Sequence, residues 1–265
     1  MKEIRAGVEG LVERLESETK DMELYGPLPE QEECPICFLP LPRSDKELLY
    51  MACCGQTLCG GCSHASFFIG GKRSKSYLCA FCRFETQLDD LGKALIAQYN
   101  VRAEKNDADA INNLAENYRV GECGLPKDDV MALRLYLRAA ELGCLAAIGN
   151  LATSFFRDDD VLQDADFAMQ LATIAAKRGH LVSYHLIGNI YHEQGDVENT
   201  AKSWIFAAKA GHSDSMKALR TYKIDGTDVV SDDDLEAIDE AYKEAIKLEW
   251  SEEREAFKIF TSKRV

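Results

Sequence analysis

Apolar and polar positions follow a helical period over most of the chain after residue 88. Four apolar residues fall on one helical face and predict a connecting helix over residues 89–104: Leu91, Leu95, Ile96 and Tyr99. Further along, a small residue, an aliphatic residue four positions later and an aromatic residue eight positions later recur in three blocks, at 109–118, 146–155 and 182–191. A pattern that repeats in this way predicts a series of similar helix hairpins.

Each block is followed by a second helical segment that ends in two alanines, two further residues and a glycine, at 139–143, 175–179 and 207–211. Paired alanines allow helix backbones to approach closely, and the glycine predicts a left-handed residue at the helix end. Asp128, Asp164 and Asp196 stand before the second helices, where a carboxylate caps free backbone amides. The hairpins therefore carry their own start and stop signals.

The first 29 residues have a weaker pattern. Five apolar residues recur at helical spacing between acidic residues and predict a short amphipathic helix: Ile4, Val8, Leu11, Val12 and Leu15. The sequence from Gly26 to Pro29 has the composition of a linker. Two interpretations stay open for residues 1–29, a partly disordered acidic arm and a helix that docks or dimerises.

Eight of the ten cysteines lie between residues 34 and 82, as four close pairs. The pairs are Cys34 with Cys37, Cys53 with Cys54, Cys59 with Cys62, and Cys79 with Cys82. This number and spacing predict two tetrahedral zinc ions bound by thiolates. A segment of this size cannot be held by apolar burial alone, so the metal would supply much of its folding free energy.

Composition narrows the choice of partners. The net charge is −14, and the acidity lies outside the cysteine module, which is close to neutral. An acidic chain has no attraction for phosphate backbones, which argues against nucleic acid as a partner. The N-terminus lacks an apolar signal core, and the longest uncharged run, at 142–156, is too short to span a membrane. We expect an intracellular, cytoplasmic protein without a membrane partner, and leave the nucleus open.

The order of the cysteine pairs resembles a RING finger in the variant whose eight ligands are all cysteine. Gln56 stands where most members have a histidine ligand, and adjacent Cys53 and Cys54 replace the usual pair. The cross-brace of the family implies one zinc on the first and third pairs and a second zinc on the other two pairs. His64 is an alternative ligand, although its position after Cys62 suits a short helix better.

A RING finger docks a ubiquitin-conjugating enzyme and acts by positioning it, without a nucleophile of its own. The resemblance implies that this enzyme would be contacted by four residues: Ile36, Phe67, Phe81 and Arg83. Ile36 stands inside the first CxxC pair and Arg83 directly follows the last cysteine, as in active members. Ser66 and Ala80 depart from the residues that the family usually carries at their positions.

The repeated blocks resemble Sel1-like repeats, which are relatives of the tetratricopeptide repeat. Three repeats are clear, at about 107–143, 144–179 and 180–211, and a fourth at 212–250 is degraded. A last helix over 252–260 is expected to cap the stack. Tyr136 and Trp204 occupy the same repeat position and are read as packing residues. The family implies a concave face that binds another protein.

Together these features predict a mostly α-helical protein in which a small zinc-stabilised RING-like module precedes an α-solenoid of helix hairpins. The expected domains are residues 1–29, 30–86 and 88–265. The resemblance implies a ubiquitin-protein ligase with two structural zinc ions and a substrate protein bound to the repeats. The alternative is a non-catalytic, zinc-stabilised adaptor. A further alternative makes the N-terminal helix a dimerisation device.

Overall fold

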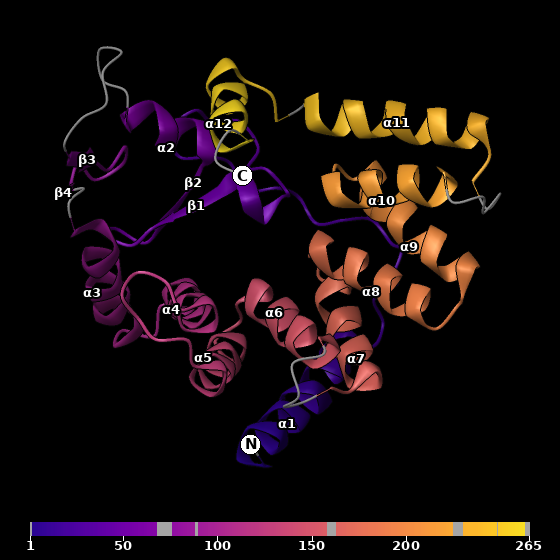
Figure 1. The fold of residues 1–265 in the computed structure, drawn as a ribbon, viewed down its shortest axis with the longest axis horizontal. Helices are drawn as coiled ribbons and strands as arrows, with labels where there is room; N and C mark the ends of the chain where they lie inside the picture. The colour runs from indigo at the N-terminus through magenta and orange to yellow at the C-terminus, as the bar shows by residue number, and fades with distance from the viewer. Residues whose placement is uncertain are drawn as a thin grey trace. The chain divides into compact units, whose positions relative to one another are not determined.

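The computed structural model describes residues 2–67, 76–87, 90–157, 163–224, 230–247 and 249–262. The chain divides into two compact units, which we call the cysteine unit and the repeat unit. The cysteine unit comprises Gln31–Cys144 and Leu248–Val265, and the repeat unit comprises Met1–Glu30 and Leu145–Lys247. Helices dominate both units (Figure 1), which confirms the predicted mostly helical class. None of the described helices has the length and apolar content needed to cross a membrane.

The cysteine unit begins with two antiparallel hairpins. In the first hairpin β1 (Leu48–Met51) pairs with β2 (Gln56–Cys59), so that Leu48 lies opposite Cys59. In the second, β3 (Ser76–Leu78) pairs with β4 (Glu85–Gln87). The 3-10 turn η1 (Asp45–Glu47) precedes β1, and α2 (Gly60–Phe67) follows β2 directly. The core between these short elements consists of cysteines with Leu41, Met51 and Leu58.

Three helices complete the middle of this unit: α3 (Leu91–Ala103), α4 (Ala108–Val120) and α5 (Asp129–Glu141). The first hairpin packs onto them because Ala52 shares an apolar cluster with Tyr99, Ala110 and Leu114. The hydroxyl of Tyr50 also donates to Asp107, 2.6 Å away. The boundary expected near residue 87 therefore lies inside one compact unit.

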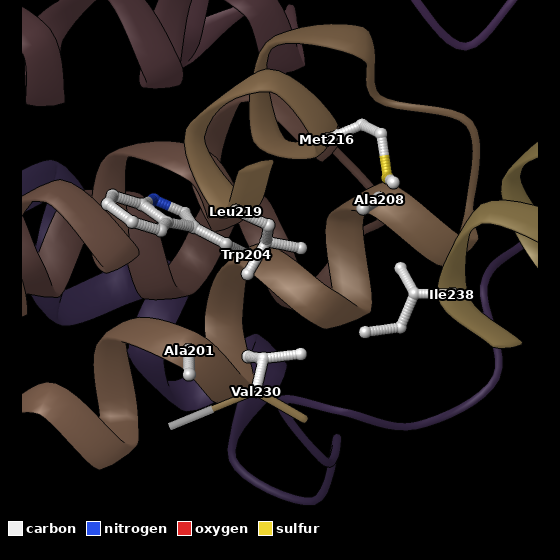
Figure 2. Packing of buried hydrophobic residues seen from close by; sticks show 7 residues of the cluster. All are labelled: Ala201, Trp204, Ala208, Met216, Leu219, Val230 and Ile238. Atoms are coloured by element: carbon white, nitrogen blue, oxygen red, sulfur yellow. The ribbon is translucent and has the colours of Figure 1, made fainter. Parts of the chain in front are cut away.

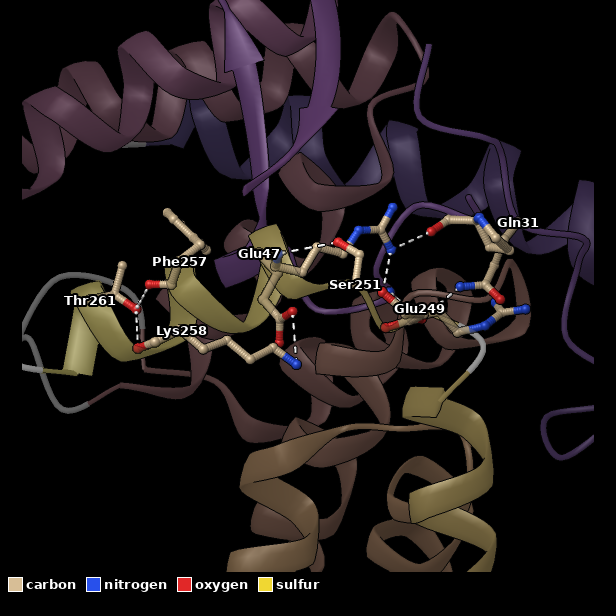
Figure 3. Close-up of polar contacts among 10 residues, drawn as sticks. Gln31, Glu47, Glu249, Ser251, Phe257, Lys258 and Thr261 are labelled. Atoms are coloured by element: carbon tan, nitrogen blue, oxygen red, sulfur yellow. Dashed lines mark hydrogen bonds and ion pairs between the residues drawn. The ribbon is translucent and has the colours of Figure 1, made fainter. Parts of the chain in front are cut away.

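The last helix, α12 (Glu252–Ser262), corrects an expectation. We expected residues 252–260 to cap the helical repeats, but α12 packs against α2 of the cysteine module (Figure 1). Glu249, just before α12, accepts hydrogen bonds from the Gln31 side chain at 2.7 Å and the Arg43 amide at 3.1 Å (Figure 3). Lys258 forms an ion pair with Glu47 at 3.2 Å. These polar contacts, together with the Phe257 ring against His64, tie α12 to the cysteine module.

The repeat unit is built from helices alone within its described residues. Its elements are α1 (Lys2–Thr19), α6 (Leu145–Phe156), α7 (Ala165–Lys177), α8 (Leu181–Glu193), α9 (Val197–Lys209), α10 (Ser213–Ile224) and α11 (Asp232–Lys247). Helix α1 packs on α7 and buries the five apolar residues that predicted it. Residues 2–19 therefore form the amphipathic helix that their spacing predicted and not a disordered arm. Docking of a partner and dimerisation through this helix stay predictions.

The glycines and aspartates that predicted the ends and starts of the hairpin helices are confirmed in these roles. Gly143, Gly179 and Gly211 have φ angles of 97°, 96° and 98°, a region that side chains disfavour. The residue after each glycine donates its amide to the first alanine of the pair, at 3.0 to 3.1 Å, which closes the helix end. The carboxylates of Asp128, Asp164 and Asp196 each accept an amide three residues later.

An apolar cluster joins α9, α10 and α11 (Figure 2). Trp204 and Ala201 of α9, Met216 and Leu219 of α10, and Ile238 of α11 are all nearly inaccessible to solvent. The indole nitrogen of Trp204 donates to a backbone oxygen and a side-chain oxygen of α8, each 3.2 Å away. Trp204 therefore packs between helices, as expected from its repeat position. Tyr136 at the equivalent position is fully buried.

Candidate metal centre

The first cysteine pair lies on a tight backbone turn, which we call the first knuckle. The amide of Cys34 donates to the carbonyl of Leu39 at 2.9 Å, and the amide of Phe38 donates back to Cys34 at 2.9 Å. Phe38 takes a left-handed conformation with φ of 59°. This turn directs two thiols to the same side, which is the arrangement that a shared metal requires.

The last cysteine pair repeats this geometry in a second knuckle. The amide of Cys79 donates to Phe84 at 2.9 Å, and the amide of Arg83 donates to Cys79 at 3.0 Å. Arg83 takes the left-handed conformation, with φ of 62°. Arg83 and Phe38 thus occupy equivalent backbone positions, a relation that the side chains alone do not suggest.

The other two pairs are placed by the first hairpin. Cys53 and Cys54 lie in the turn between β1 and β2, where Gly55 adopts a φ of 75° and donates its amide to Met51 at 2.7 Å. Cys59 ends β2 and Cys62 lies in the first turn of α2. The Cys62 amide lies 3.4 Å from the Cys59 sulfur. The hairpin therefore places one cysteine pair at its turn and the other at the end of its second strand.

The structure brings the eight cysteines together as two quartets. The first quartet is Cys34, Cys37, Cys59 and Cys62, and the second quartet is Cys53, Cys54, Cys79 and Cys82. Within each, the sulfur atoms all lie within 4.8 Å of one another. These are the two sets that the cross-brace resemblance implied.

Sulfur separations test whether the quartets fit a metal. Four thiolates bound to zinc at about 2.3 Å in a tetrahedron lie about 3.8 Å apart, whereas a disulfide holds its sulfurs at about 2.05 Å. The Cys37–Cys59 and Cys54–Cys79 distances are 3.9 Å, and the Cys53–Cys82 distance is 3.5 Å. The residues therefore fit tetrahedral zinc and not disulfides. Zinc bound there would supply a fixed centre without redox chemistry.

Thiols within each quartet differ in acidity. In the first quartet, a hydrogen bond from the Cys62 thiol lowers the pKa of Cys59 to about 4, and Arg254 acts in the same direction. In the second quartet, burial raises the pKa of Cys54 to about 11 and also raises the pKa of Cys53. The hydrogen bond to Cys59 also raises the pKa of Cys62 in the first quartet, and backbone amides lower the pKa of Cys79 in the second. Because metal binds the thiolate, both quartets must release protons when they take up zinc at neutral pH.

Arg254 of α12 is a site residue that the sequence analysis missed. Its side chain is buried, and Nη2 donates to the sulfur of Cys37 at 3.4 Å. Nothing in the local sequence marks it, because 217 residues separate the two partners.

Three of the four residues expected to contact a conjugating enzyme are on the surface of the knuckles. Ile36 is 36% exposed and Phe81 is 46% exposed, and Arg83, two residues after Phe81, is also exposed. Phe67 ends α2, and its side chain lies outside the described residues. Phe38 and Phe84 are also exposed and were not anticipated.

His64 does not join either quartet. Its ring lies against the ring of Phe257 of α12, with centroids 6.2 Å apart, and burial lowers its pKa. Among the described residues, the groups that could hold a metal consist of cysteine alone. The alternative of His64 as a ligand is therefore not supported by its position.

The fold and site define a helical-repeat protein with a cysteine-rich module. The family model described as Sel1 repeat matches residues 108–144 and 145–180, which confirms two of the expected repeats. No family model of the RING type matches the cysteine module. No curated protein matches the chain.

Two solved structures are similar to part of this chain. A Sel1 repeat protein from Oxalobacter formigenes is 24% identical over 58% of this chain and 65% of its own, with a TM-score of 0.49. A protective antigen of uropathogenic Escherichia coli, described as displaying an SLR fold, is 22% identical over 66% of this chain and 44% of its own, with a TM-score of 0.45. The matched region thus spans less than two thirds of either relative.

Proposed function

We propose that this chain is an adaptor in which two zinc ions hold the cysteine module and the Sel1 repeats bind a partner protein. The repeats support this proposal because Sel1-type hairpins are used for protein–protein interaction. Each quartet supplies four thiolates, which fills a tetrahedral zinc and leaves no open position for catalysis. An intracellular location belongs to the proposal, since reduced thiols are needed for the metal.

The observation that carries the proposal is the direct packing of the metal-binding hairpin on the first Sel1 repeat. Cys53 and Cys54 lie in the β1–β2 turn, and the adjoining Ala52 is buried against α3 and α4. The Arg102 side chain donates to the Ala52 carbonyl at 2.6 Å. A metal in the hairpin would therefore stabilise the start of the partner-binding repeats.

A ubiquitin-protein ligase is the second candidate. It is favoured by the exposure of Ile36, Phe81 and Arg83 at the two knuckles, where the RING resemblance implies contacts with a conjugating enzyme. Arginine suits a bridging role because its planar fork offers several donors at once. In this candidate the repeats would bind the substrate.

Metal analysis and reconstitution separate the candidates. Protein purified under reducing conditions should contain two zinc ions per chain; one ion or none would contradict both candidates. With an activating enzyme and a panel of conjugating enzymes, an adaptor forms no ubiquitin chains. A partner should cross-link to residues within 108–209.

If ubiquitin chains do form, the ligase function is correct and the adaptor function is wrong. Arg83→Ala should then abolish chain formation without loss of zinc. Phe38→Ala is the matched control for folding, because Phe38 holds the equivalent left-handed position in the first knuckle. Equal zinc content in both variants shows that the change at Arg83 acts through its side chain and not through the knuckle.

A further inference from the structure

Arg254 joins the C-terminal helix to the first quartet. Its side chain is buried, and the residue retains only 3% of its accessible surface. Nη1 donates to the carbonyls of Pro40 at 2.8 Å and Glu249 at 2.7 Å. Nη2 donates to the Cys37 sulfur at 3.4 Å, with the Leu39 carbonyl at 3.5 Å. One guanidinium therefore bridges the first knuckle and the segment that leads into α12.

Charge explains why a cation belongs there. Four thiolates around one zinc ion carry a net charge of −2, and burying that charge is unfavourable unless it is compensated. Arginine supplies a permanent positive charge and several N–H donors in a fixed plane. Residues that donate hydrogen bonds to metal ligands orient them and typically raise metal affinity 10- to 100-fold.

The surface on which α12 packs lies between two ligands of the first quartet. Gly60 and Gly61 separate the ligands Cys59 and Cys62, and neither has room for a side chain. A Cβ on Gly60 would clash with the Phe257 ring, and a Cβ on Gly61 would clash with the backbone of α12. The turn that a metal would order is thus the surface on which α12 packs.

We propose that Arg254 is a positioning residue of the metal site in the first quartet, and that metal in this site holds α12 on the cysteine module. The proposal rests on the zinc occupancy proposed above. It assigns the last helix to the metal site and not to the repeats.

The second quartet provides an internal comparison. Among the described residues, its sulfurs take hydrogen bonds from other cysteines, Cys79 with Cys54 and Cys82 with Cys53, and from backbone amides, but none from a cation. A change at Arg254 should therefore act on one site and spare the other.

Cysteine alkylation followed by mass spectrometry tests this in the full-length, zinc-loaded chain under a limiting chelator. In Arg254→Leu, Cys34 and Cys37 should become alkylated at a 10- to 100-fold lower chelator concentration than in the wild type. Cys79 and Cys82 should keep their wild-type protection. Lys258→Leu is the matched control, since it breaks the ion pair of α12 with Glu47 without touching a sulfur.

Hydrogen exchange measures the second part of the proposal. Zinc removal from the wild type should increase exchange over residues 252–262, and Arg254→Leu should show that increase with zinc still in excess. If Arg254→Leu fails to fold, Arg254→Lys keeps the charge but loses the planar fork, and it should show intermediate sensitivity at Cys34 and Cys37.

Two results would overturn the proposal. In the first, Cys34 and Cys37 are protected from alkylation as well in both Arg254 variants as in the wild type. In the second, the variants lose protection equally at both quartets. A wild type without zinc would instead refute the proposed function. The two failures are therefore distinguishable.

Discussion

Tyr50 illustrates how single polar contacts attach the β1–β2 hairpin, which carries Cys53 and Cys54, to the repeats. Its hydroxyl donates to Asp107, which also accepts from Arg102 at 3.1 Å and caps α4 through the Ala110 amide at 3.1 Å. Burial alone would raise the pKa of Asp107, but these hydrogen bonds lower it, so the carboxylate is charged at neutral pH. The Tyr50 contact is therefore a hydrogen bond to a partly buried charge.

Tyr50→Phe should remove this hydrogen bond and leave the ring in place against Tyr99, with which it stacks at 6.2 Å. A hydrogen bond to a charged group contributes about 1.5–3 kcal/mol. We expect the free energy of unfolding of the cysteine unit to fall by about 2 kcal/mol in chemical denaturation with zinc in excess. Tyr118→Phe in the same helix cluster is the control, and an equal effect there would contradict the assignment.

At the scale of elements, the segment after α1 is fixed to the repeat unit by Tyr25. Its ring packs against both Tyr184 and Phe206, with centroids 6.1 Å and 5.5 Å away, and its hydroxyl is 2.8 Å from Ser203. The ammonium of Lys202 lies 4.6 Å from the ring centre, within the range of a cation–π contact. Aromatic packing therefore holds this segment onto α8 and α9.

Tyr25→Ala should release the segment between α1 and the cysteine module. Because Tyr25 is only half-buried, we expect a loss of about 2 kcal/mol, below the usual cost of deleting a core aromatic. Hydrogen exchange should rise over residues 20–29. Tyr25→Phe keeps the ring contacts and should retain most of the protection; equal exchange in the two variants would show that Ser203 and not the ring stack fixes the segment.

Among the elements, those defined by neighbouring residues could be predicted from the sequence, and those defined by distant contacts could not. Helix ends were predictable because Asp164 and Gly179 act on backbone groups a few residues away. The quartets were predictable because chemistry limits what closely spaced cysteines do. Tyr25 and Arg254 were not predictable, because their partners lie 178 and 217 residues away and only the folded chain brings them together. For the same reason the prediction that residues 252–260 cap the repeats was wrong.

At the scale of the whole molecule, the two units should respond differently to metal. The cysteine unit has few large apolar residues around its quartets, whereas α7, α8 and α9 bury Leu171, Ile187 and Trp204 in cores that contain no cysteine ligand. Structural zinc typically contributes about 10–16 kcal/mol to the folding of small cysteine modules. We therefore expect removal of metal to destabilise the cysteine unit and to spare the repeat unit.

Removing zinc with a chelator under reducing conditions should raise hydrogen exchange first over residues 34–62 and 76–87. The effect should extend into α3 and α4, because Ala52 and Tyr50 pack there and would leave with the hairpin. Exchange over α7 to α9 should stay at the zinc-loaded level, and most helical circular dichroism should persist. Adding zinc back should restore protection, which separates metal loss from irreversible oxidation of the thiols. If α7 to α9 lost protection together with the hairpins, the units would fold as one cooperative structure, and the metal would support the whole repeat array.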